Sequence, residues 1–578
     1  MWFTSLLITI ALATLVACTP VTSVFAKRDG RHLTTGIETR AGGGHPYIRR
    51  EIHDLKNNNP ESWSLYILGL HAFHQTDQND PLSYYQISGI HSKPWKPWQD
   101  ANGAENPGGH GYCPHNNMMF APWHRPYVVL FEQELYKHVR SVAEQATTDQ
   151  RRWIMAADAF RQPYWDWALG HNGGDFPDFF STPSITVNGP NGEQTIPNPL
   201  YQYAFHPVSI DDFDDDWGQL NTTLRCPASH EAGVQSQNQV VSQTFSNARR
   251  LWHDDIARSF EKSLDFNDFA KRVQGAHGGP HVTIGGFMPA RGHMWIFDYS
   301  AFDPIFMLVH ANVDRIFALY QAAHPEQWME PISSGAYGNF WIPKRSTLDA
   351  NMQMQPFWKD EKSFYTPNDI RNTSIFGYAY PETQYWKYAS DEEWRAAVNS
   401  SIALQYSSSA RAMLKSGKQD GSSLTHLLKD NSFIDWTINI KASTLDMPPI
   451  FQMMFSLSDP SSLDLSMEVG SWLYQMSGHR DELELEQKIE GSIGLTSSLL
   501  DQIATDKLRS LDANDVMSYL KTHLTWKIIT GDVIHVENKP NSLVIEAVST
   551  QVRIPDDPTQ RLEYRDETTS YPVAMQKD

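Results

Sequence analysis

Residues 302–321 read FDPIFMLVHANVDRIFALYQ and form the most strongly patterned stretch of the chain. Their apolar residues recur at helical spacing, and His310, Asp314 and Phe317 fall on one face at positions i, i+4 and i+7. The stretch therefore predicts a helix that points His310 inward and places Asp314 on the same face. A neutral imidazole is a ligand for copper, zinc, iron and nickel, so His310 by itself indicates only a metal.

Five further histidines extend this site in both directions along the chain. The segments that hold them are YYQISGIHSKP, YCPHNNMMFAPWHRP and VQGAHGGPH. Three plus three imidazoles suit two adjacent copper ions, whose redox chemistry needs open coordination positions. The two predicted groups are His91, His115 and His124, and His277, His281 and His310.

The order of the motifs carries a family resemblance. CPH is followed by PWHRPY, RQPYWDW, an H-x-x-x-H pair and FDPIF-x-x-x-HANVDR, and together they resemble the fungal tyrosinases, which are binuclear copper oxidases of phenols. The resemblance runs from about Tyr47 to about Tyr378 and resumes more weakly from about Phe433. It implies two copper ions, one on each histidine group, in a four-helix bundle within a mainly α catalytic domain. It also implies O2-dependent oxidation of phenols and catechols to o-quinones.

Two features depart from that family pattern. Val309 precedes His310 where the family commonly has a second histidine, so the ligand is expected to be the one four residues before Asp314. Between His277 and His281 stand two glycines and a proline, which cost about 1 and about 3 kcal/mol respectively inside a helix. This pair is therefore expected in a first helical turn, where Pro280 is tolerated, or in a distorted turn.

Two more helices are predicted before the middle of the chain. One lies within residues 47–75, and a second spans 126–142 and places His124 at its head, with Pro126 in the first turn. Residues 168–235 are rich in Gly, Pro, Asn and Asp and are expected to be loops on the helical core.

The period of the sequence changes after about residue 430. Ile434, Trp436, Ile438, Ile440 and Ala442 alternate with polar residues, and 451–457 and 543–547 repeat the pattern, which predicts strands. A short helix is expected at 512–524, with Asp512 as its N-cap. The predicted domains are a signal peptide (1–26), a catalytic domain (27–390), a linker with the processing region (391–430) and a C-terminal β-sandwich-like shielding domain (431–578). Within the linker, LKSGKQDGSS at 414–423 is the candidate cleavage segment.

The N-terminus and the composition bear on localisation and partners. An apolar stretch from Leu6 to Ala17 precedes small residues ending at Ala26, as in a secretory signal, and sequons stand at Asn221, Asn372 and Asn399. Secretion is expected, with an intracellular or vesicular location as the alternative. The formal charge of −20 argues against nucleic acid and against anionic membranes as partners. The expected partners are a phenolic small molecule and O2, and the sequence leaves the oligomeric state open.

Two cysteines remain outside the signal segment, and they have two alternative fates. Cys113 and Cys226 are expected to form a disulfide or to stay as separate thiols on cysteine count alone. Cys113 stands two residues before His115, and the resemblance implies a thioether between these two residues, which we favour. Such a bond would fix the His115 ring on a Gly-rich loop.

Further residues are expected to support the ligands or to compete with them. Asp314 is predicted to hold a ligand or to anchor its helix through Arg315, with a simple intrahelical pair as the alternative. His71, His74 and His110 are alternative ligands on spacing alone, but the family's first ligand segment matches His91. His293 is expected to be structural, and the core scaffold behind the site is expected to comprise Arg161, Tyr164, Trp165, Asp166 and Trp167.

Three positions are predicted to decide which phenols react. Gln274 stands where the family often has a Glu that holds a water, and Gln is not a base. Gly278 follows His277 where efficient monophenol hydroxylators often carry Asn or Asp, and Phe297 resembles a gate residue over the second copper. All three favour oxidation of diphenols over hydroxylation of monophenols.

The C-terminal domain suggests regulation. In fungal tyrosinases a domain in this place covers the copper cleft of a latent proenzyme and is cut away, so Trp472, Leu473 and Tyr474 are possible plugs, with ordinary core packing as the alternative for each. The competing functions are an o-aminophenol oxidase, a non-catalytic oxygen-binding protein and a zinc hydrolase. The last is disfavoured because no carboxylate base stands inside the H-x-x-x-H motif.

Overall fold

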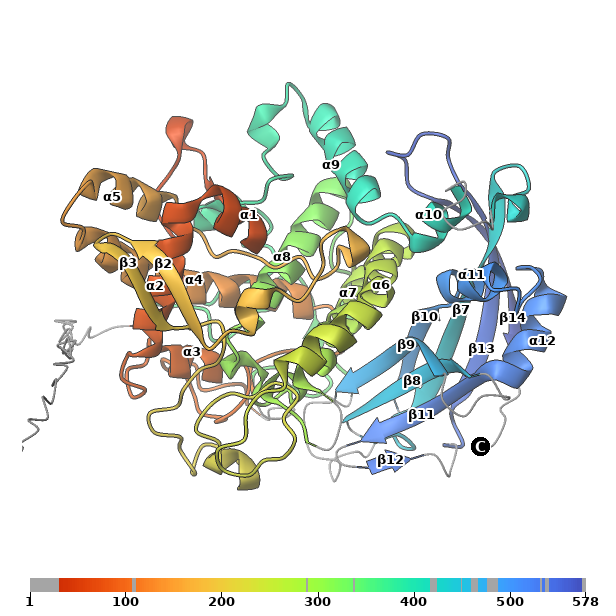
Figure 1. Cartoon of the computed structure of the whole chain (residues 1–578), viewed down its shortest axis with the longest axis horizontal. Helices are drawn as coiled ribbons and strands as arrows, with labels where there is room; N and C mark the ends of the chain where they lie inside the picture. Colours follow the sequence, from red (N-terminus) through yellow and green to blue (C-terminus); the bar gives the residue numbers. More distant parts are fainter. Residues whose placement is uncertain are drawn as a thin grey trace, which may run out of the picture.

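The fold of this chain comes from a computed structural model and combines a helical domain with a β-sandwich (Figure 1). The structure describes residues 31–573 except 106–110, 287–289, 336–337, 416–423, 449, 459–465, 476–486, 531–532 and 536–539. The predicted signal peptide and His110 lie outside these residues. The two-domain prediction, mainly α followed by β-rich, is confirmed.

Five long helices build the core of the first domain: α2 (Pro60–His74), α4 (Phe120–Glu144), α6 (Asn238–Lys262), α7 (Phe266–Gly285) and α8 (Phe306–Ala323). Helix α4 packs against α2, α7 and α8, and α7 lies between α8 and α6 (Figure 1). Shorter helices surround them, namely α1 (Ile52–Asn58), α3 (Tyr84–Gly89) and α5 (Gln150–Ala159). The short strand pairs are β1 (Tyr47–Ile48) with β6 (Tyr378–Ala379), β2 (Ser184–Gly189) with β3 (Gly192–Pro197), and β4 (Ile332–Ser333) with β5 (Thr347–Leu348).

Helix α4 begins earlier than its sequence pattern predicts. The prediction starts the helix at residue 126, whereas it begins at Phe120, so Pro126 lies inside it and His124 one turn from its start. Pro122 occupies the true first turn, where a missing N–H costs nothing. Almost the whole of its first half is buried, and this tertiary packing stabilises a helix that tolerates Pro126.

The C-terminal domain is a sandwich of two four-stranded antiparallel sheets with strand orders β10-β7-β13-β14 and β12-β11-β8-β9. The predicted alternation holds along β7, where Trp436, Ile438 and Ile440 are buried. Two helices pack on it, α11 (Thr496–Ala504) and α12 (Ala513–His523), although Asp512 makes no side-chain cap. The strands are β7 (Ser432–Ser443), β8 (Ile450–Ser458), β9 (Ser466–Gln475), β10 (Lys488–Gly494), β11 (Leu524–Thr530), β12 (Val533–His535), β13 (Val544–Arg553) and β14 (Glu563–Pro572).

The predicted linker is partly helical. Residues 391–405 and 409–415 form α9 (Asp391–Gln405) and α10 (Ser409–Lys415), and the Ser390 side chain caps α9 by accepting from the Glu393 N–H. Three acidic residues in the first turn of α9 suit the positive end of the helix dipole. Most of the candidate cleavage segment, residues 416–423, lies outside the described part of the chain.

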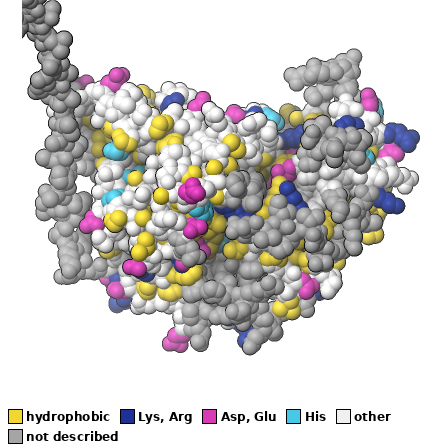
Figure 2. Space-filling model, turned by 60° about the horizontal axis from the view of Figure 1, so that its bottom comes forward, with side chains coloured by type: hydrophobic (Ala, Val, Ile, Leu, Met, Phe, Trp, Pro, Cys, Tyr) yellow, Lys and Arg dark blue, Asp and Glu magenta, His cyan; other side chains and the backbone are white. Residues whose placement is uncertain are grey.

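Helix α6 carries much of the interface between the two domains. Arg250 pairs with Asp501 at 2.5 Å, and Lys262 pairs with Asp435 at 2.9 Å. The β-sandwich therefore rests on α6 and α7, beside the ends of β9 and β10 (Figure 1). On the face in Figure 2, acidic side chains are scattered among hydrophobic and uncharged ones. None of the described helices combines the length and apolar character needed to cross a membrane.

Candidate metal centre

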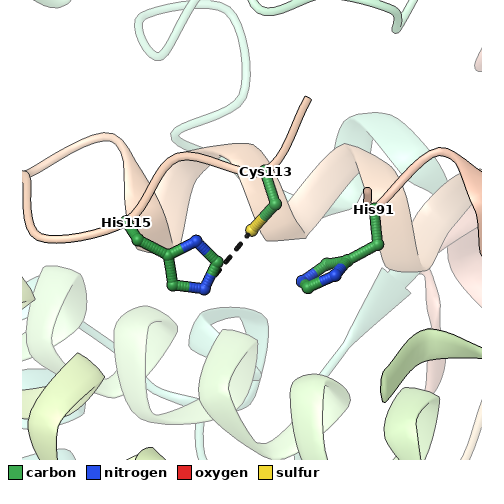
Figure 3. A group of neighbouring side chains, drawn as sticks. All are labelled: His91, Cys113 and His115. Atoms are coloured by element: carbon green, nitrogen blue, oxygen red, sulfur yellow. Dashed lines mark hydrogen bonds between the residues drawn. The ribbon is translucent and has the colours of Figure 1, made fainter. Parts of the chain in front are cut away.

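The first histidine group gathers on one side of α4. His91 lies just after α3, His115 on the loop before α4, and His124 within α4. The ring centroid of His91 is 5.8 Å from that of His115 and 6.0 Å from that of His124. Figure 3 shows His91 and His115 pointing into the same space, together with Cys113.

The second group comes from α7 and α8. His277 and His281 lie one turn apart on α7, His310 lies on α8, and their ligand nitrogens are all within 4.8 Å of one another. The expectation that this pair sits in a first turn is wrong, because α7 begins at Phe266 and continues past Pro280 to Gly285. Burial of most of this helix against its neighbours offsets the poor helix propensity of the HGGPH segment.

The two groups face each other. The rings of His124 and His310 stack with centroids 4.5 Å apart, and His310 also lies 6.4 Å from His91. All six side chains are buried. The α4 and α8 contact therefore joins the two groups into one centre.

Backbone carbonyls orient five of the six rings. Because a carbonyl only accepts, each bonded Nδ1 carries a proton and each Nε2 keeps its lone pair. Nε2 of His281 and of His310 is buried without a hydrogen-bond partner, as expected of nitrogens that face a metal. The Nδ1–H donors and their acceptors are His91 to Phe297 (3.1 Å), His124 to Phe120 (2.8 Å), His277 to Gln274 (2.5 Å), His281 to Met294 (3.0 Å) and His310 to Phe306 (2.9 Å).

Burial keeps these imidazoles neutral. Desolvation lowers the pKa of His115 and of His124 to about 3 and that of His281 to about 4. It also lowers the pKa of the other three histidines, His91, His277 and His310, well below the ordinary value. Neutral rings with free Nε2 atoms fit copper, and no carboxylate belongs to either of the metal-sized groups found among the described residues.

Cys113 lies among the first group. Its buried sulfur is 3.4 Å from Nε2 of His124 and 3.9 Å from Nε2 of His115 (Figure 3). Cys226 is also a free, buried thiol, so the disulfide alternative is wrong. The thioether between Cys113 and His115 stays a prediction.

The three positions predicted to decide substrate choice lie around this centre. The side-chain oxygen of Gln274 accepts from the backbone N–H of Asn116 at 2.9 Å, so this amide ties α7 to the loop that carries His115. Phe297 packs against His91 and His115, with centroids 4.8 and 4.3 Å away, and thus on the first group rather than the second. No motif in the sequence points to the role of Asn116.

Gly278 lies under the C-terminal domain. A Cβ on this residue would be 2.9 Å from Cδ2 of Leu473 on β9. Trp472 and Tyr474 instead pack on Phe451 in the core of the sandwich, Trp472 edge to face and Tyr474 stacked. A cavity of about 260 Å³ is lined by His115 and by residues of both domains, including Tyr474 and Gln487 of the C-terminal domain.

The predicted supporting residues hold the helices rather than the rings. Asp314 binds Arg125 and Arg49, and Arg315 binds Asp166 at 2.9 Å and also Glu382, so the intrahelical pair is not formed. The predicted scaffold segment also holds α8. The backbone N–H of Trp165 donates to the carbonyl of Leu308, and the indole N–H of Trp167 donates to the carbonyl of Val309.

The alternative ligands lie elsewhere. His74 packs between Tyr84 and Tyr203, and His71 is half-buried on the same helix. The buried His293 accepts from the backbone N–H of Leu224, which is a structural role. None of these three belongs to the metal-sized groups found among the described residues.

Known proteins share both domains. The common central domain of tyrosinase matches residues 81–323, and the tyrosinase C-terminal domain matches 435–547. A tyrosinase of Neurospora crassa is 28% identical, with 92% of this chain and 95% of that protein covered. A tyrosinase of Podospora anserina is 29% identical, with 83% and 98% covered.

Solved structures share the fold. A crystal structure of latent and active mushroom tyrosinase superposes with a TM-score of 0.80 at 23% identity, over 95% of this chain and 100% of that one. The holo-protyrosinase of Aspergillus oryzae gives a TM-score of 0.69 at 18% identity, over 93% and 97%. The two matching domains, in this order and around these histidines, show that the chain belongs to the tyrosinase family.

Proposed function

We propose that this chain is a latent enzyme in which two copper ions catalyse the oxidation of phenols and catechols to o-quinones with O2. The observation that carries the proposal is that the group of His277, His281 and His310 faces a second group, His91 and His115 with Cys113, and that His124 on α4 stacks on His310 of α8 between them. His91, His115 and His124 would hold one copper ion, and His277, His281 and His310 the other. Bound copper supplies the one-electron redox steps that couple a two-electron substrate to O2.

The balance of the reaction is simple. Each catechol loses two electrons and two protons, and one O2 takes four electrons and four protons from two catechols to leave as water. The protein contributes a dry site, because the aromatic rings of Phe120, Phe297 and Phe306 pack directly on the ligand imidazoles. Exclusion of water protects the reactive species from side reactions.

The surroundings of His277 favour diphenols as substrates. Hydroxylation of a monophenol needs a group that takes the phenol proton, and a suitable base must lie within hydrogen-bond reach. Gly278 offers no side chain there, and the Gln274 amide is neutral and engaged with Asn116. A catechol binds and loses its protons more easily, so we infer that catechol oxidation exceeds monophenol hydroxylation.

Latency is supported by the place of the C-terminal domain. Strand β9 packs on α7, which carries two of the proposed ligands, and Leu473 lies on Gly278. A phenol reaching His277 from this side would have to displace this strand. We propose the activating cut within LKSGKQDGSS at 414–423, which precedes the first strand of the sandwich.

Secretion is part of the same proposal. Residues 1–26 would direct export and be removed. The thioether would form between Cys113 and His115 during copper loading, with O2 as the oxidant that takes up the two electrons and two protons released from the S–H and ring C–H bonds. Mass spectrometry of the N-terminus of protein from the culture medium checks the first point. A mature chain beginning near residue 27 or 29 is expected.

Metal analysis and paired assays test the proposal. The purified full chain should contain two copper ions, and His281→Ala should lower this number to one. His71 is half-buried outside the centre, so His71→Ala should leave the copper content unchanged. Limited proteolysis should raise the catechol oxidation rate several-fold. Zinc in place of copper, or no turnover of catechol before and after trimming, would overturn the proposal. Faster turnover of an o-aminophenol than of the matching catechol would identify the chain as an o-aminophenol oxidase instead.

A further inference from the structure

Leu473 occupies the space that a side chain at position 278 would need. A Cβ on Gly278 would lie 2.9 Å from Leu473 Cδ2, 3.4 Å from its Cβ and 3.7 Å from its Cγ. Carbon atoms in folded proteins do not approach one another to 2.9 Å, since the optimum is about 3.5–4.0 Å. A side chain at position 278 would therefore require the end of the Leu473 side chain to move away from α7.

Among residues 472–474 of β9, Leu473 is the one whose side chain faces Gly278 on α7. Successive side chains of a strand point to opposite faces. Trp472 and Tyr474 pack in the sandwich, where Trp472 meets Phe451 edge to face, Tyr474 stacks on Phe451, and Trp472 also covers Gly491. Leu473 points the other way, toward α7, and is held in place by the packing of its neighbours.

We propose that position 278 couples substrate choice to latency: its lack of a side chain both withholds a polar group from the phenol beside His277 and admits Leu473 of the shielding domain. The inference rests on the proposed latent oxidase. A polar residue at 278 that helps monophenol hydroxylation would also push Leu473 off α7. It would leave an amide or carboxylate against an apolar side chain, which is unfavourable without a hydrogen-bond partner.

Helix α7 offers a matched control three residues away. A Cβ on Gly275 would meet no atom within 4 Å, whereas one on Gly279 would collide with the indole of Trp252. Alanine is the better helix former at either position. Gly275→Ala and Gly278→Ala therefore add the same methyl group to the same helix, and only the second one touches Leu473.

The experiment measures latency in the copper-loaded full chain. The readout is the catechol oxidation rate after limited proteolysis divided by the rate before it. Wild type and Gly275→Ala should keep a high ratio, whereas Gly278→Ala and Gly278→Asn should bring the ratio toward unity. In a chain that already carries Leu473→Ala, Gly278→Ala should change the ratio little, because the effects of substitutions at two contacting residues are not additive. After trimming, Gly278→Asn should raise the monophenol rate relative to the catechol rate.

Hydrogen exchange of residues 466–475 gives a readout that needs no activity. Exchange should accelerate in Gly278→Ala and stay at the wild-type rate in Gly275→Ala. An unchanged ratio together with unchanged exchange in Gly278→Ala would overturn the inference. If trimmed wild type oxidises no catechol, the proposed function fails, and the exchange data still decide whether Leu473 depends on Gly278.

Discussion

Arg125 and Asp314 form a fully buried ion pair, with Nε and Oδ1 2.5 Å apart, that joins α4 to α8. Arg125 directly follows His124 on α4, and Asp314 lies one turn after His310 on α8. The ion pair therefore joins the two helices that carry these two proposed copper ligands. Arg49 completes the pair at 3.1 Å from the other carboxylate oxygen. Burial opposes the ionisation of Asp314, but the two guanidinium groups outweigh it and hold its pKa below the ordinary value.

Loss of this carboxylate should be costly. Asp314→Asn leaves the buried Arg125 without a counter-charge and Arg49 with Glu132 alone, and it should lower the free energy of unfolding by about 3–5 kcal/mol. Urea unfolding of the metal-free chain measures the change. The exposed pair of Arg50 and Asp54 is the control, and Asp54→Asn should cost at most about 1 kcal/mol. An equal loss of unfolding free energy in both variants would show that the buried network stabilises the fold no more than an exposed ion pair does.

The proposed thioether predicts a defined mass. A cross-link from Cys113 to His115 removes two hydrogen atoms, so the peptide that contains both residues should be lighter by that mass and should resist alkylation. The 3.9 Å between the sulfur and the His115 ring already places the partners in contact. Cys226 is the internal control, because it lies in the same chain and should alkylate fully after unfolding. Full alkylation of Cys113 in copper-loaded protein would contradict the cross-link.

The three sequons should differ in glycan occupancy. Asn221 and Asn372 are exposed, whereas the side-chain oxygen of Asn399 accepts from Arg561 of the C-terminal domain at 2.5 Å. A glycan on Asn399 would separate these two groups. Glycopeptide analysis of the secreted latent chain should find sugar at the first two sites and none at Asn399. An occupied Asn399 in a chain that is still latent would mean that the Arg561 contact is dispensable.

Acidic conditions should stabilise one part of the domain interface. Desolvation of Glu261 on α6 raises its pKa to about 8, with Asp435 adding to the shift and Lys262, Arg561 and a hydrogen bond from Tyr564 opposing it. The folded chain thus binds a proton that the unfolded chain releases near pH 4.5. This contribution to stability is fully present below about pH 4.5 and is lost as the pH rises toward 8.

Glu261→Gln provides the test. The amide stays uncharged at every pH and its oxygen still accepts from Tyr564, so the variant should lose less stability than wild type between pH 5 and about 8. Chemical denaturation of the full chain across this range is the measurement. Parallel curves for the two proteins would show that Glu261 does not titrate at the interface.

Local patterns predicted the elements, but not their distant partners. The period of 3.6 located α8 and the period of two located β7 and β8, because each pattern reflects burial of one face. The start of α4 was missed because Pro126 reads as a helix start, although the true start is set by packing around Phe120.

The same division runs through the site. Helical spacing makes Phe120 and Phe306 natural acceptors for His124 and His310, since each lies four residues earlier. The acceptor of His91 lies 206 residues away in Phe297, and no local rule points to it. The alternation of side chains along β9 places Leu473 on the face opposite to that of Trp472 and Tyr474, but it does not indicate which face meets α7. Such contacts depend on how whole elements pack.

The backbone acceptors of the ligand rings have a consequence for how this family can diversify. Gln274 and Phe297 each orient a proposed copper ligand, His277 and His91 respectively, through the main-chain carbonyl. Every amino acid has that carbonyl. Mutation can therefore explore new side chains at these two positions during evolution without removing the hydrogen bonds that orient His277 and His91.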